Sequence, residues 1–433
     1  MQIQIKGVRV VDPGNIEGIR DISIKDGLFE AVSEPGQLPE VAKDASDASD
    51  VKVIDGQGLI AVPGLIDVHV HLREPGQEYK ETIETGLKAA AAGGITAVCA
   101  MPNTKPVNDN AQVTAFILSQ AKKANASRVY PVGAISRNLE GEKLNDIADM
   151  KKAGIRAVTD DGMPVTDSQL MRRTLEYCKS LGLPVLVHAE DKRLADGGSM
   201  NEGLPATVMG IKGIPNAAES VMVMRDIALA ELTGARVHFC HMSTAQSIEA
   251  IRAAKAKGLP VTCETAPHYF TLTDADMPAY DTNFKMNPPL RSDKDRAAII
   301  EGLTDGTIDM IATDHAPHAE DEKQVEFDLA AFGIVGLETS LGLSLALVAQ
   351  GHLTLAQLVQ KMAKAPADLM GINNDIVPGN PADLTLINMD AGWTVDPNLF
   401  VSKGRNTPFA GRRLTGAAAL TIVDGRIIYA MDD

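Results

Sequence analysis

Short apolar segments alternate with helical segments through the middle of the chain, and this repeat limits the fold more than any other feature. Eight segments have the length and composition of buried strands. Eight βα units over about 310 residues are typical of a (β/α)8 barrel of the TIM type, an α/β fold, with an open doubly wound sheet as the alternative. Strands are expected at Leu65–Leu72, Ile95–Pro102, Arg128–Gly133, Ile155–Asp161, Pro184–Ala189, Arg236–Met242, Pro260–Ala266 and Ile308–Asp314, with helices at Glu81–Ala92, Gln112–Ala124, Ser168–Ser180, Ala217–Thr233, Thr244–Lys257 and Asp293–Leu303.

Both ends of the chain differ from the middle, because they contain strand patterns separated by turns and little helical periodicity. We expect residues 1–60 and 371–433 to pair into one small β-sandwich domain, with residues 61–370 forming the barrel. The polar segment 38–50 is expected to be a surface loop.

The charge balance excludes several classes of partner. The formal net charge is −16, which argues against binding of nucleic acid or of an anionic membrane, so an anionic substrate must be attracted locally. The sequence has no run of 18 apolar residues, and its start lacks a signal-peptide pattern. The four cysteines show no CxxC spacing, which favours buried thiols in a reducing cytoplasm.

Polar residues follow the expected strands at their carboxyl ends, where barrels of this type carry their active sites. His69 and His71 lie two apart on one strand, so they share a face, and Arg73 follows. Of the nine histidines in the chain, seven stand at such strand ends, which predicts a metal site. The further ends are Met101-Pro-Asn103-Thr104, Thr159-Asp160-Asp161-Gly162, His188-Ala-Glu190, His241-Met-Ser, Glu264-Thr-Ala-Pro-His268 and Thr313-Asp314-His315-Ala-Pro-His318.

The residue types suggest separate roles for these residues around a zinc ion. Zinc lowers the pKa of a bound water toward neutrality, which yields a nucleophile. Asp314 could contact the metal, accept the proton of that water and pass it to a leaving nitrogen. Arg73 and Asn103 stand beside the metal, and a guanidinium fits a carboxylate in bidentate fashion. Neutral nitrogen ligands can come from His69, His71, His188 and His241, and carboxylate ligands from Asp161 and Asp314.

Several of these residues have plainer interpretations. The Asp160-Asp161-Gly162 stretch could be only a turn after a strand, Asn103 could cap the next helix, and Arg73 could pair with Glu74 or Asp67.

Other polar residues are expected away from the reacting atoms, or stay open. His238 falls in mid-strand, which favours a packing role, and His352 falls in a solvated loop. Glu190 and His315 could support the ligands or face solvent. The charged segment 320–327 could be a lid or an ordinary solvated loop.

Together these motifs resemble the amidohydrolase superfamily, and within it most closely the longer bacterial (class I) dihydroorotases. The stretch DVHVHLREPGQEYKETIETG resembles the first signature of that family, and ATDHAPH resembles the second. The segments MPNT, TDDG, VHAED, FCHMS, KMNPPLR and FGIVGLETSL are also similar, so the resemblance covers essentially the whole chain.

The resemblance implies zinc-dependent, reversible hydrolysis of L-dihydroorotate to N-carbamoyl-L-aspartate in pyrimidine synthesis, with one or two zinc ions. It implies that His69 and His71 bind one zinc with Asp161 and Asp314, and that His188 and His241 bind a second, with Asp161 bridging. It gives Asp314 the role of proton shuttle. Substrate contacts are implied for His71, Arg73, Asn103, Asn287 and His318, with backbone contacts from Phe332 and Gly333.

The segment before Asp161 departs from many relatives, whose metal bridge is a carbamylated lysine. No lysine lies between Ile155 and Asp161, which counts against the hydantoinase branch. Asp160 and Asp161 are both possible ligands, and strand alternation favours Asp161, because Asp161 shares a face with Thr159 and Ala157, and small residues suit the crowded barrel interior.

Two other functions compete with this one. The chain could hydrolyse another cyclic amide, such as a hydantoin or allantoin, or it could be an inactive structural partner of aspartate transcarbamoylase. All four candidate histidines are present, which disfavours the inactive partner. We expect a cytoplasmic homo-oligomer with a small-molecule substrate, and the sequence is compatible with a complex with aspartate transcarbamoylase.

Overall fold

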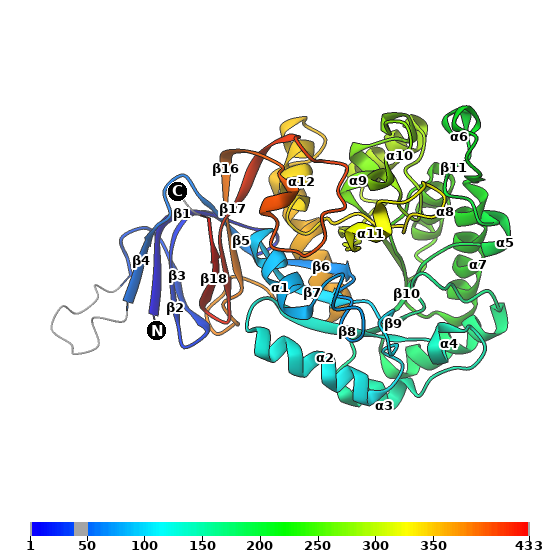
Figure 1. Cartoon of the computed structure of the whole chain (residues 1–433). Coiled ribbons are helices and arrows are strands. Elements are labelled where there is room, and N and C mark those ends of the chain that lie inside the picture. Colours follow the sequence, from blue (N-terminus) through cyan, green and yellow to red (C-terminus); the bar gives the residue numbers. More distant parts are fainter. Residues whose placement is uncertain (1, 39–50, 432–433) are drawn as a thin grey trace.

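The computed structural model describes residues 2–38 and 51–431 and divides them into a barrel and a terminal sheet (Figure 1). Residues 39–50, most of the segment expected to be a loop, lie outside the described residues. The predicted α/β fold class is confirmed, because eight parallel strands form the barrel and the terminal strands form an additional sheet.

Each of the eight expected segments contains one barrel strand, and neighbours along the chain pair in parallel. The sheet closes between its first and last strands through a bridge from Val70 to His315, where the His71 N–H donates to His315 O (2.9 Å). The strands are β6 (Leu65–Val70), β7 (Ile95–Ala100), β8 (Arg128–Ala134), β9 (Ala157–Thr159), β10 (Val185–Val187), β13 (Val237–Phe239), β14 (Val261–Thr265) and β15 (Met310–Ile311).

The six expected helices are present, and polar side chains define several of their starts. Asn110 and Asp167, for example, accept backbone N–H groups at the N-termini of α2 and α4. The longer helices are α1 (Ile83–Ala92), α2 (Ala111–Ala124), α3 (Ile147–Ala153), α4 (Ser168–Leu181), α7 (Ala217–Thr233), α8 (Ala245–Ala256), α10 (Asp293–Asp305) and α12 (Ser340–Ala349). The shorter ones are α5 (Lys192–Ala195), α6 (Leu204–Met209), α9 (Pro267–Thr271), α11 (Glu320–Lys323), α13 (Leu355–Val359), a π-helix (Gln360–Lys364) and α14 (Ala365–Met370).

Two apolar layers fix the barrel. One lies between strands and helices, and the other fills the interior with side chains such as Val68, Val132 and Leu186. Leu369 and Met370 of α14 belong to the interior cluster, so they close the amino end of the barrel. The open end is therefore the carboxyl end, where the predicted functional residues stand.

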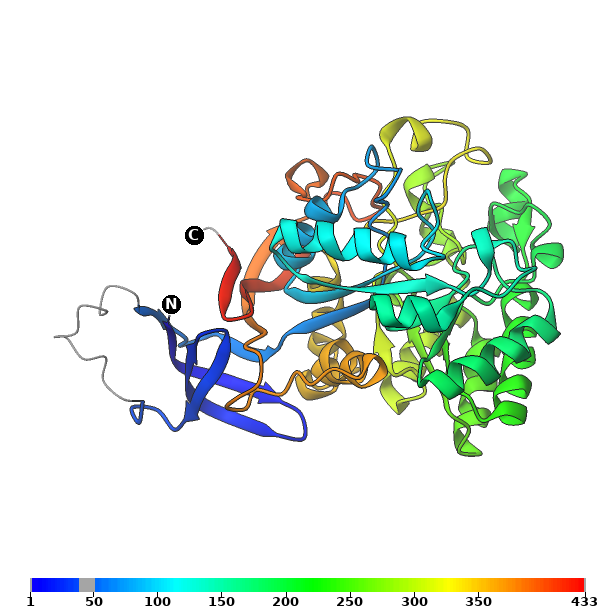
Figure 2. The same ribbon diagram turned by 90° about the horizontal axis from the view of Figure 1, so that it is seen from below.

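The terminal sheet combines both ends of the chain. Its strand order is β18-β17-β16-β5-β1-β2-β3, with β4 also paired to β1, and the red and orange C-terminal strands lie between the dark blue strands and the barrel (Figure 2). Side chains of both ends share one apolar cluster. The division of the chain at residues 60 and 370 stays a prediction. The strands are β1 (Gln2–Asp12), β2 (Ile16–Lys25), β3 (Leu28–Ser33), β4 (Val51–Asp55), β5 (Ile60–Pro63), β16 (Leu384–Thr394), β17 (Arg413–Val423) and β18 (Arg426–Ala430).

No helix among the described residues is long and apolar enough to cross a membrane. All four cysteine side chains are buried thiols.

Candidate active site

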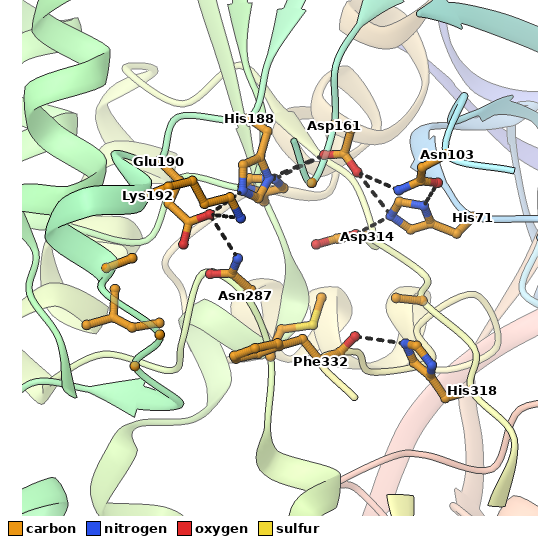
Figure 3. A pocket seen from close by; sticks show the side chains of 18 of the residues that line it. His71, Asn103, Asp161, His188, Glu190, Lys192, Asn287, Asp314, His318 and Phe332 are labelled. Atoms are coloured by element: carbon orange, nitrogen blue, oxygen red, sulfur yellow. Dashed lines mark hydrogen bonds and ion pairs between the residues drawn. The ribbon is translucent and has the colours of Figure 1, made fainter. Parts of the chain in front are cut away.

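A cavity of about 350 Å³ opens at the carboxyl ends of the barrel strands and brings most of the predicted site residues together (Figure 3). His69 lies in the barrel interior with no exposed surface, and Gly333 is the neighbour of a lining residue. The predicted residues that line the cavity are His71, Arg73, Asn103, Asp161, His188, His241, Asn287, Asp314, His318 and Phe332.

Asp161 is the centre of the cluster. One of its oxygens, Oδ1, lies 3.3 Å from His69 Nε2, 3.4 Å from His188 Nδ1 and 3.6 Å from His241 Nε2. The other, Oδ2, lies 3.5 Å from His71 Nε2. The carboxylate thus faces all four candidate histidines, which come from three different strand ends.

The neighbouring Asp160 points away from this cluster. Its carboxylate accepts the backbone N–H groups of Ile135 (2.8 Å) and Ser136 (3.0 Å) and the Ser136 hydroxyl. The geometry therefore gives Asp160 a role in joining two strand ends and leaves Asp161 as the carboxylate of the cavity, the residue preferred from strand alternation.

Asp314 supplies the second carboxylate. Its Oδ1 lies 3.1 Å from His71 Nε2 and 3.5 Å from His69 Nε2. Asp314 (φ +48°) and His241 (φ +39°) both have left-handed backbone conformations, which are unfavourable for residues with a Cβ. Such strain persists where the surrounding structure enforces it, as it does at functional sites.

The donor set fits a metal ion. Two groups of three buried ligand types converge here, one of them His69, His71 and Asp314, the other His69, Asp161 and His241. Two buried atoms that face this space, His69 Nε2 and Asp161 Oδ1, have no hydrogen-bond partner within the described protein. Buried polar atoms normally have partners, so an ion between these atoms would account for both. Histidine and aspartate together are ligands typical of zinc.

Glu264 is a functional candidate that the sequence interpretation named only as part of a strand end. Its buried carboxylate accepts His69 Nδ1–H (2.9 Å) and contacts His238 Nε2 (3.0 Å). Burial raises the pKa of Glu264, but its bonds to His238 and His69 outweigh that effect and lower the pKa to about 2. An ionised Glu264 fixes the His69 tautomer that leaves Nε2 free for a metal. His238 has the expected packing role, with Glu264 as its partner.

Glu190 has an equivalent position behind His188, which decides between the two interpretations left open for it. It is 6% exposed, and its Oε2 lies 3.4 Å from His188 Nε2 and 2.6 Å from Lys192 Nζ. The same oxygen accepts Asn287 Nδ2–H (3.3 Å). Glu190 therefore supports a candidate ligand and one side of the cavity rather than facing solvent.

Arg73 lies on the opposite side, with His318. Its Nε donates to Pro317 O (3.1 Å), and its NH2 lies 3.3 Å from His318 Nε2. His318 Nε2 also lies 2.8 Å from Phe332 O and donates there. Burial and the positive charges of Arg73 and Lys80 lower the pKa of His318 to about 2, so this imidazole is neutral. Arg73 thus lines the cavity beside a neutral partner, rather than pairing with Glu74 or Asp67.

The remaining candidates take different places. Asn103 accepts His71 Nδ1–H (2.8 Å) and donates to Asp161 (3.3 Å), whereas the cap of the next helix is Asn110. His315 is fully buried beside Glu81 (3.4 Å), so it does not face solvent.

Comparisons with known proteins agree with this geometry. Residues 58–247 match the dihydro-orotase-like family. The chain is similar to a dihydroorotase of Desulforapulum autotrophicum (60% identity, 99% of each chain) and to one of Geotalea daltonii (52% identity, 100% of each chain). Among solved structures it is similar to the L-hydantoinase of Arthrobacter aurescens, with a TM-score of 0.87 and 27% identity, over 99% of this chain and 96% of that one.

Proposed function

The chain belongs to the dihydroorotase family, and we propose that its cavity catalyses the reversible hydrolysis of L-dihydroorotate to N-carbamoyl-L-aspartate in pyrimidine synthesis. The observation that carries the proposal is the buried cluster of four histidines and two aspartates beside Arg73, in a chain 60% identical to a dihydroorotase. A set of candidate metal ligands suits a cyclic amide that bears a carboxylate when it lies next to a guanidinium such as that of Arg73, which has no carboxylate within ion-pair distance among the described residues.

We propose Zn²⁺ as the metal, with one or two ions in each subunit. His69, His71, Asp161 and Asp314 would hold the first ion, and His188, His241 and Asp161 would hold a second. Bound zinc lowers the pKa of a water toward neutrality. The contact of Asp161 with all four histidines supports its role as the bridge.

The other residues would position substrate and move the proton. Arg73 would hold the ring carboxylate through paired N–H donors. Asp314 would take the proton from the attacking water and give it to the ring nitrogen as the C–N bond breaks. Contacts to the substrate carboxylate and ring amide would come from His71, Asn103, Asn287 and His318, and from the backbone at Phe332 and Gly333.

An ultraviolet assay of the purified protein tests this function directly. L-Dihydroorotate, hydantoin and allantoin are each offered with and without a zinc chelator. We expect loss of dihydroorotate only, and only without the chelator. Turnover of hydantoin or allantoin alone would contradict the proposal and favour another cyclic-amide hydrolase.

Replacing Arg73 by alanine is expected to raise the KM for dihydroorotate about 100-fold, the usual cost of removing one partner of a desolvated charge pair. Arg73→Lys should recover part of that loss, because an ammonium cannot bind a carboxylate in bidentate fashion. Steady-state kinetics measure both values. Lys192→Ala is the matched control, since Lys192 is a cation on the opposite wall. An unchanged KM in Arg73→Ala would refute the carboxylate contact.

Replacing Glu264 by glutamine is expected to weaken zinc binding about 10- to 100-fold, the effect typical of a lost outer partner of a histidine ligand. The variant keeps the side-chain volume but no longer presents a charged acceptor to His69. Competition with a fluorescent chelator measures the affinity without any assay of activity. Equal affinity in variant and wild type would show that Glu264 does not support the metal site.

We also propose a cellular location, an oligomeric state and a partner for the enzyme. We propose a cytoplasmic homo-oligomer that binds neither nucleic acid nor membranes, in keeping with the net charge of −16. A complex with aspartate transcarbamoylase is also proposed. Light scattering of the protein alone and mixed with that enzyme tests both assemblies.

A further inference from the structure

Two buried lysines beside the cavity have no part in the proposed reaction. Lys285 is 2% exposed and Lys323 is 5% exposed. Among the described residues, no carboxylate lies within ion-pair distance of either side chain, although most buried ammonium groups have such a partner. Lys323 belongs to the charged run 320–327, which the sequence alone could assign only to a lid or a solvated loop.

Backbone carbonyl groups take the place of carboxylates. Lys323 Nζ donates to Ala331 O (2.8 Å) and Gly333 O (3.2 Å), and lies 3.4 Å from Lys285 O. Lys285 Nζ donates to Phe327 O (2.8 Å) and Asp328 O (3.0 Å). Four of these five carbonyls belong to one segment, residues 327–333, so both lysine side chains bind the backbone of this segment.

The same segment forms a wall of the cavity. Phe332 lines the cavity, and its carbonyl oxygen accepts His318 Nε2–H (Figure 3). Lys285 Nζ also lies 4.4 Å from the centre of the Phe332 ring, within the range of a cation–π contact. The Phe332 ring therefore contacts Lys285, and the Phe332 carbonyl contacts His318.

Gly333 shows how little freedom the segment has. Its N–H donates to Lys285 O (3.0 Å), and its carbonyl accepts both Lys323 Nζ and Asn406 Nδ2 (3.0 Å). Its φ is +159°, and a Cβ there would lie 2.5 Å from Ala316 O. The backbone at this point is therefore held by the Lys323 side chain, by the Lys285 backbone carbonyl and by the Asn406 side chain.

We propose that Lys285 and Lys323 are positioning residues, whose ammonium groups hold residues 327–333 in the place where Phe332 contacts the substrate. The role toward substrate rests on the proposed function, whereas the hold on the segment stands on the contacts alone. Burial and the adjacent Lys285 lower the pKa of Lys323 to about 7, against the attraction of Asp281. Burial lowers the pKa of Lys285 to about 8, against the attraction of Asp328. Burial therefore disfavours the charged form of both side chains, and the carbonyl oxygens supply acceptors for their N–H groups.

Lys323→Met in the full-length, zinc-loaded protein tests the proposal. Methionine has similar length but donates no hydrogen bond. We expect the KM for dihydroorotate to rise about tenfold, with kcat changed less than about threefold, because a displaced wall weakens binding without altering the reacting groups. Amide hydrogen exchange in residues 324–333 should become about tenfold faster.

Lys361→Met is the matched control. Lys361 is also buried (7% exposed) and also donates to a carbonyl, that of Ile308 (2.6 Å), but it does not line the cavity. This variant should leave both the KM and exchange in residues 324–333 unchanged. If Lys323→Met does not fold, Lys323→Gln, which keeps an N–H donor, should show smaller changes in the same directions.

The two readouts separate the two proposals. Exchange in residues 324–333 that stays at the wild-type rate in Lys323→Met would overturn the positioning role, whatever the activity. Faster exchange with an unchanged KM would overturn the contact of this wall with substrate. Absence of dihydroorotate turnover in the wild-type protein would instead count against the proposed function, and the exchange data would still decide the role of the lysines.

Discussion

Replacing Asp314 by asparagine is expected to lower kcat about 1,000-fold in both directions of the reaction, since a positioned proton-transfer group contributes about 10²- to 10⁴-fold. The carboxylate lines the cavity and lies 3.1 Å from His71 Nε2 and 3.5 Å from His69 Nε2. Asparagine has nearly the same shape and still offers an oxygen, but it cannot accept the proton. Steady-state assays of ring opening and of ring closure measure the effect.

Two controls make this result specific. The zinc content of Asp314→Asn must be measured, so that a lost proton acceptor can be told from a lost metal. Asp67→Asn is the matched variant, because Asp67 is also a buried aspartate but does not line the cavity, and its carboxylate accepts the backbone N–H groups of His69 and Thr313. It should keep kcat within about threefold. A kcat for Asp314→Asn within tenfold of wild type would refute the shuttle.

Replacing Asp161 by alanine is expected to remove most of the bound zinc and to lower kcat/KM at least about 1,000-fold. The reason is geometric, because this carboxylate faces all four histidines, and its loss removes both a ligand and the negative charge that offsets the charge of the cation. Metal analysis after dialysis, together with the assay, gives both quantities.

The adjacent Asp160 provides the control. Asp160→Asn should lose the bond to the Ser136 hydroxyl and cost about 1–3 kcal/mol of stability, without loss of zinc. If Asp160→Asn lost the metal and Asp161→Ala kept it, the assignment of the two residues would be reversed.

The barrel could be predicted because its strands are short apolar runs and its main helices are amphipathic. Helix α12 was not predicted, since SLGLSLALVA is apolar on nearly every face and so lacks helical periodicity. The π-helix and α14 were also not predicted, because their position depends on packing against the amino end of the barrel.

The candidate ligand histidines could be proposed from the strand ends, but the residues that support them could not. Glu264 contacts His69, which lies 195 residues earlier in the chain, so only the closed barrel brings them together. The sequence around Lys323 favours an exposed side chain, because lysine among acidic residues usually marks a solvated face. In the structure this side chain is buried. Its burial depends on carbonyl groups, which every residue carries and no sequence pattern reveals.

The closing contact between the first and last barrel strands has a consequence for heat resistance. A single bridge between Val70 and His315 closes this seam, so it is among the shortest pairings in the barrel sheet. Local opening begins where few bonds must break. His69 and His71 lie at the end of the first barrel strand, and Asp314 follows the last one. An ion held by all three would therefore link these two strands. With zinc bound as proposed, occupancy of the site and integrity of the barrel would be one linked equilibrium, and free zinc would raise the temperature of opening.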